Sequence, residues 1–121
     1  MIKFTIPFRL PSLNEYTKDN RNDKNIGNRT KQKTESDILK VLMTVKGKIQ
    51  GPIKIKFTWH EKTYRRDKDN VAFAKKFILD ALQKSKILPN DNNKYVQGFE
   101  DKFVYKQGDS VVVEIEEIEE N

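Results

Sequence analysis

The chain is short, lean in apolar residues and basic. Its 121 residues fit one domain, because a second independently folded core would be difficult to build from this length. Hydrophobic residues make up 36% and charged residues 35%, which describes a small core under a heavily charged surface. There is no cysteine, so disulfides and thiolate metal sites are excluded. We expect a single domain over residues 1–121.

No part of the sequence resembles a membrane or targeting segment. The N-terminal residues lack an apolar leader core, and no apolar run approaches the length that spans a bilayer. We therefore expect a cytoplasmic protein without membrane association.

Positive charge is concentrated in the first nine-tenths of the chain. Formal net charge is +6, and the six acidic side chains of residues 109–121, which hold no Lys or Arg, leave +12 on residues 1–108. Such an excess favours contacts with nucleic-acid phosphates. A charged surface that only keeps the protein in solution explains the composition equally well.

Apolar periodicity predicts the first elements in chain order. Alternation over residues 2–6 predicts a strand. Residues 18–34 are polar, basic and nearly free of apolar side chains, so we expect a flexible basic loop there. Apolar side chains at helical spacing over residues 38–45, followed by Gly47, predict an amphipathic helix.

The second half of the chain completes a mixed pattern. Residues 53–59 alternate cleanly and predict a strand, residues 69–84 predict the most apolar helix, and Pro89 follows its end. Strands are expected at about 95–106 and 111–118, joined by a turn at residues 107–109, with 109–121 as an acidic C-terminal strand or tail. The order β-α-β-α-β-β predicts an α/β (α+β) fold: a mixed β-sheet of about four strands with two main helices.

The segment between the second strand and the apolar helix carries the best candidate chemistry. Asp67, Asp69 and Asn70 place two carboxylates and a carboxamide within four residues. Mg²⁺ takes such hard oxygen ligands, usually one or two carboxylates with water and substrate phosphate. Helix capping is the alternative explanation, since Asp is favoured at a helix N-terminus. Capping accounts for one aspartate more readily than for two together with Asn70.

These motifs, in this order, resemble the RusA family of Holliday-junction resolvases, small endonucleases of phages and prophages. The resemblance covers nearly the whole chain. It rests on Pro11-Ser12-Leu13-Asn14-Glu15-Tyr16, Asp67-Lys68-Asp69-Asn70, Asp80-Ala81-Leu82 and Asp91. The D-x-D-N motif alone is weak, whereas the ordered set in a basic chain of this length is fairly specific.

The resemblance implies a homodimeric endodeoxyribonuclease that makes paired nicks in four-way DNA junctions, with Mg²⁺ or, in its place, Mn²⁺. It implies catalytic roles for Asp67, Asp69, Lys76 and Asp91, with the three carboxylates as metal ligands. The candidates for contacts with DNA are Asn14, Arg29, Lys31, Lys33, Arg65 and Arg66.

The choice of lysine depends on spacing. Nine residues separate the Asp69-Asn70 pair from Asp80, about three more than in the family pattern, so counting back from Asp80 gives Lys76. In one continuous helix Lys76 shares a face with Asp69, at about 100° per residue. The neighbouring Lys75 remains a competitor. Two alternatives remain for the function of the protein: a non-catalytic nucleic-acid-binding phage protein, or a nuclease for other branched DNA.

Overall fold

A four-stranded mixed sheet forms one layer of the molecule. The computed structural model describes residues 1–106 and 108–118. The strands are β1 (Ile2–Ile6), β2 (Ile53–Glu61), β3 (Val96–Tyr105) and β4 (Ser110–Glu117), in the spatial order β1-β4-β2-β3. β4 runs antiparallel to both β1 and β2, and β3 runs parallel to β2. The predicted mixed sheet of four strands is therefore confirmed.

The last two strands follow each other in sequence but do not pair. β2 lies between them, so the connection passes across the end of β2 instead of closing a hairpin. Two hydrogen bonds hold this connection there. The Lys106 amide donates to the Glu61 carbonyl (2.8 Å), and the Lys62 amide donates to Asp109 Oδ1 (3.0 Å). The turn predicted at residues 107–109 includes Gln107, which lies outside the described residues.

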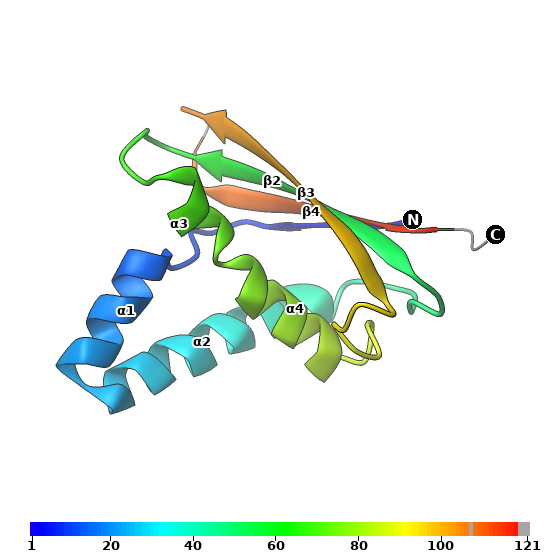
Figure 1. The fold of residues 1–121 in the computed structure, drawn as a ribbon, viewed down its shortest axis with the longest axis horizontal. Coiled ribbons are helices and arrows are strands. Elements are labelled where there is room, and N and C mark those ends of the chain that lie inside the picture. The colour runs from blue at the N-terminus through cyan, green and yellow to red at the C-terminus, as the bar shows by residue number, and fades with distance from the viewer. Residues whose placement is uncertain (107, 119–121) are drawn as a thin grey trace.

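The helices form the second layer, on one face of the sheet (Figure 1). They are α1 (Leu13–Asn22), α2 (Lys24–Leu42), α3 (Lys68–Ala72) and α4 (Lys75–Lys84). Alternate side chains of β2, from Ile53 to Trp59, are buried under this layer, where they meet apolar residues of α2 and α4 such as Ile38 and Phe77. One core between two layers results, as the alternation predicts.

The prediction of a flexible loop at residues 18–34 was wrong, because this segment forms the end of α1 and the first half of α2. Its stability comes from polar contacts that apolar periodicity does not register. The Asp23 carboxylate caps α2 by accepting from the Asn25 amide (2.8 Å). The Thr30 hydroxyl donates to Asp19 across the two helices (2.9 Å). Gly27 is buried where a Cβ atom would lie 1.6 Å from Asn20 Oδ1 and 3.3 Å from Asn20 Cα, so a larger residue would displace the Asn20 side chain at this close approach.

The helix predicted at residues 69–84 is interrupted between α3 and α4. At Phe73 and Ala74 the backbone hydrogen bonds tighten from four residues to three: Lys76 donates to the Phe73 carbonyl and Phe77 to the Ala74 carbonyl. The Phe73 ring packs at the break against Tyr16 and Phe77, with centroids 5.8 and 5.7 Å away. The break gives α3 and α4 different directions (Figure 1).

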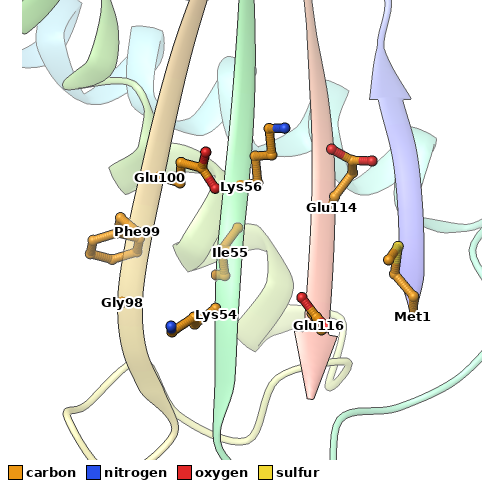
Figure 2. A pocket seen from close by; sticks show the side chains of 9 residues that line it. All are labelled: Met1, Lys54, Ile55, Lys56, Gly98, Phe99, Glu100, Glu114 and Glu116. Atoms are coloured by element: carbon orange, nitrogen blue, oxygen red, sulfur yellow. The ribbon is translucent and has the colours of Figure 1, made fainter. Parts of the chain in front are cut away.

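The other face of the sheet is not covered by any helix of residues 1–106 and 108–118 (Figure 2). Figure 2 shows Lys54, Lys56, Glu100, Glu114 and Glu116 on this face, with the helices behind the strands. A shallow hollow of about 440 Å³ lies among them. Opposite charges on neighbouring strands are the usual way in which a solvated sheet face is stabilised. No helix in the described part of the chain is long and apolar enough to cross a membrane.

Candidate functional site

Arg66 fixes the loop that joins β2 to α3. Its Nε and Nη2 atoms donate to the two carboxylate oxygens of Glu61, both at 2.7 Å, and Glu61 is only 5% exposed. Its Nη1 atom donates to the Leu10 carbonyl (2.8 Å) and to Glu15 (3.1 Å). Burial opposes the charge of Arg66, but the hydrogen bonds and charges of Glu61 and Glu15 outweigh it and raise its pKa. Arg66 was predicted to contact DNA, but its guanidinium is used inside the protein.

Glu15 extends this network to the start of α1. It accepts two hydrogen bonds from Arg9, at 2.7 and 2.9 Å, and forms a capping box with Ser12. Partial burial would raise the pKa of Glu15, but the bonds from Arg9 and Ser12 prevail and lower it to about 2. The network holds the start of α1 beside the loop that precedes α3.

Asp67 and Asp69 lie at the beginning of α3, next to this network. Asp67 occupies the N-cap position, yet its side chain accepts no capping hydrogen bond. Both side chains are exposed, and neither carboxylate has a hydrogen-bond or ion-pair partner among the described residues. Capping therefore does not account for Asp67 in this structure. The two carboxylates are available to a ligand from solution.

A small polar pocket brings residues of the first two sequence motifs, around Asn14 and around Asp67, together. It has a volume of about 210 Å³. It is lined by Arg9, Ser12, Asn14, Glu15, Arg65, Arg66, Asp67 and Asn70. Asn14, from the first turn of α1, thus shares a surface with Arg65, Asp67 and Asn70, as the sequence predicts for parts of one site. Arg65 is exposed, unlike the neighbouring Arg66.

Asp91 is not part of this pocket. It lies in the loop before β3, where the Tyr95 carbonyl accepts from Ile53 at the start of β2. Asp67 follows the other end of β2, and a nine-residue strand spans about 26 Å. Figure 1 shows α3 and this loop at opposite ends of the sheet. Within residues 1–106 and 108–118, no three Asp, Glu or His side chains form a metal-binding group, so one chain does not assemble the predicted three-carboxylate set.

Asp91 instead lies near Asp80 of α4. Burial raises the pKa of Asp80, and the negative charges of Glu35 and Asp91 add to this, while Lys31 and Lys76 act in the opposite direction. Lys76 and Asp91 therefore belong to one charged group, between α2, α4 and the loop before β3. The face argument that linked Lys76 to Asp69 assumed one continuous helix, and the break between α3 and α4 removes that premise.

The two candidate lysines have different surroundings. Lys75 is partly buried against the sheet, where its Nζ donates to Asp101 (2.7 Å) and lies 4.8 Å from the Phe99 ring centroid. Lys76 is exposed and has no hydrogen-bond or ion-pair partner in the part of the chain that the structure describes. Lys75 has a structural role, so Lys76 is the lysine that is available to a ligand.

The basic residues predicted in a loop lie on α2. Arg29 and Lys33 are exposed, and Lys33 pairs with Asp37 one turn later (2.9 Å). Lys31 is half-buried and lies close enough to Asp80 to affect its pKa. Helical spacing thus fixes these side chains on α2, where a flexible arm was expected.

Two aromatic residues beside Asp67 were missed by the sequence analysis. Tyr64 and Tyr105 stack with ring centroids 4.3 Å apart and planes 25° apart. Burial raises the pKa of Tyr105, and the charges of Glu61 and Asp67 raise it further, which places Asp67 in its neighbourhood. The strand alternation could have indicated Tyr105, whereas no sequence signal predicts that it meets Tyr64.

Comparison with known proteins assigns no family to the chain. No protein-family model matches it, and no curated protein does. The resemblance to RusA resolvases therefore rests on the motif residues of the sequence alone.

Proposed function

We propose that this protein is a divalent-metal-dependent endonuclease that cuts branched DNA, with four-way junctions as the substrate that the RusA resemblance implies. One observation carries the proposal. Among the described residues, the carboxylates of Asp67 and Asp69 have no protein partner. Asp67 lines a pocket with Asn14, Arg65 and Asn70, and Asp69 lies two residues further on, in the first turn of α3. Neither carboxylate caps α3 through a side-chain hydrogen bond or forms an ion pair within the described chain, so both are free to hold a ligand.

The donor set suits Mg²⁺. Asp67 and Asp69 would hold the ion, since Mg²⁺ usually takes one or two carboxylates and completes its shell with water and substrate phosphate. The ion would supply activation of water and stabilisation of negative charge on the phosphate under attack. Asn70 is half-buried and would orient a carboxylate. Arg65 would position the DNA backbone through its phosphates.

Lys76 and Asp91 have a separate place in the proposal. Both act on the charge of Asp80 in α4: Lys76 lies in the first turn of that helix and Asp91 in the loop that follows it, whereas Asp67 and Asp69 lie at the beginning of α3. A homodimer, the state that the resemblance implies, offers a way for the two groups to meet from different copies. In that arrangement Lys76 would stabilise charge on the phosphate electrostatically.

Calorimetric titration with Mn²⁺ tests the metal site without DNA. We expect binding that Asp67→Asn and Asp69→Asn each weaken at least tenfold, because each removes a charged ligand. Glu116→Gln, an exposed acid on the outer sheet face, is the matched control and should leave binding unchanged. Equal Mn²⁺ binding by wild-type protein and Asp67→Asn would contradict the assignment, whatever Asp91→Asn does.

One observation favours a second candidate, a non-catalytic protein that binds nucleic acid. The described residues contain no group of three acidic or histidine ligands in one chain. This candidate shares the basic surface but predicts no Mn²⁺ site at Asp67. The same titration therefore separates the two functions.

A further inference from the structure

The loop before α3 presents an aromatic surface next to the proposed metal site. Tyr64 is 66% exposed although its ring stacks on Tyr105. Since Tyr105 covers one face of the Tyr64 ring, the exposure falls on the other face and the edges. The Tyr64 ring therefore buries little area against the protein core, whereas a loop tyrosine with only a structural role would be expected to be buried.

Positive charges surround this aromatic pair. Lys106 Nζ lies 5.6 Å from the Tyr64 centroid, and Lys68 Nζ lies 5.7 Å from the centroid of Phe103, two residues before Tyr105 on β3. Arg65 follows Tyr64 directly and lines the polar pocket with Asp67. Aromatic rings interleaved with cations are the arrangement that binds unpaired nucleotides, because every base has a face that can stack and every phosphate has a charge.

We propose that Tyr64, supported from behind by Tyr105, stacks on an unpaired nucleobase of the DNA strand whose phosphate lies at Asp67. This inference rests on the proposed function and names its substrate more closely: a strand with at least one base out of the duplex, as at a branch point. Arg65, Lys68 and Lys106 hold the adjoining phosphates. The stack discriminates against intact duplex, since paired bases present no free face to Tyr64.

Binding of single-stranded DNA in EDTA tests this inference without any cleavage. The probes are a fluorescent oligothymidine of twelve nucleotides, an oligomer of the same length that carries abasic sites in place of the bases, and a matched duplex. Wild-type protein should prefer the oligothymidine to the abasic strand. Tyr64→Ala should weaken oligothymidine binding by about 5- to 150-fold, the range that about 1–3 kcal/mol of stacking corresponds to. The same variant should bind the abasic strand as wild-type protein does.

Matched variants separate stacking from other effects. Tyr64→Phe keeps the ring and should retain wild-type affinity, whereas Tyr64→Leu keeps apolar bulk without a π face and should behave like Tyr64→Ala. Phe99→Leu, which alters an exposed ring on β3 away from the pocket, should change nothing. The inference is overturned if Tyr64→Ala and Tyr64→Leu bind oligothymidine as wild-type protein does, or if wild-type protein does not distinguish the abasic strand.

The outcome is separable from that of the endonuclease proposal. Loss of Mn²⁺ binding in Asp67→Asn with unchanged DNA binding in Tyr64→Ala would retain the metal site and reject the stack. Loss of oligothymidine binding in Tyr64→Ala, with no Mn²⁺ binding by wild-type protein, would retain the stack and reject the metal site.

Discussion

Replacement of Arg66 by methionine tests whether this arginine serves the fold or the DNA. The guanidinium makes two charge-assisted hydrogen bonds of 2.7 Å to Glu61 and a third, of 2.8 Å, to the Leu10 carbonyl. Methionine keeps much of the side-chain bulk but leaves the buried Glu61 carboxylate without its cation. Breaking a buried pair from one side costs about 3–5 kcal/mol. For a domain of this size, this loss should lower Tm by roughly 10–20 °C.

Thermal and urea denaturation, followed by circular dichroism, measure this loss. Arg65→Met is the matched control, because Arg65 is adjacent in sequence but exposed. It should leave the free energy of unfolding within about 0.5 kcal/mol of wild type and instead weaken DNA binding. If Arg66→Met were to lower stability by less than about 1 kcal/mol while reducing DNA affinity, the structural role argued for Arg66 would be refuted.

Three further predictions concern charged side chains. Because the pKa of Glu15 falls from 4.5 to about 2 on folding, its contribution is complete above pH 4.5 and is lost as the pH falls towards 2. Since Glu15 is 42% exposed, we expect this loss to be about 1 kcal/mol; acid denaturation should show it in wild-type protein but not in Glu15→Gln. Lys84→Gln removes the ion pair of Glu35, which is 2% exposed and has one oxygen without a hydrogen-bond partner among the described residues. Urea denaturation should show a free energy of unfolding lower by about 2–4 kcal/mol, and a loss below about 0.5 kcal/mol would contradict this. Lys75→Met should destabilise the protein by about 1–2 kcal/mol, whereas Lys76→Met should change cleavage and not stability; the reverse result would reassign the catalytic lysine.

The sequence predicted those parts of the fold that apolar periodicity encodes. Residues 53–59 alternate so regularly that the strand and its buried face follow directly, and the structure confirms both. Residues 18–34 lack such a pattern, and their helices depend on caps and on the close approach at Gly27. These contacts join residues that a periodicity argument considers separately.

Only part of the candidate site could be predicted, because spacing along the sequence does not show which distant segments meet. Short-range spacing singled out Asp67, Asp69 and Asn70, and the structure places two further candidates, Asn14 and Arg65, at one pocket with Asp67 and Asn70. Sequence alone could not distinguish Arg65 from Arg66, because the partners of Arg66 come from distant segments. Nor could spacing place Asp91, since the break between α3 and α4 and the length of β2 decide where it lies.

Cleavage of a synthetic junction tests the central claim most directly. A labelled four-way junction and a matched linear duplex would be incubated with wild-type protein, Asp69→Asn and Glu116→Gln, each in Mg²⁺ and in EDTA. We predict paired nicks in the junction alone, in Mg²⁺ alone, made by wild-type protein and Glu116→Gln but not by Asp69→Asn. Tight binding of the junction without cleavage in Mg²⁺ or Mn²⁺, or equal cleavage by Asp69→Asn, would contradict the account.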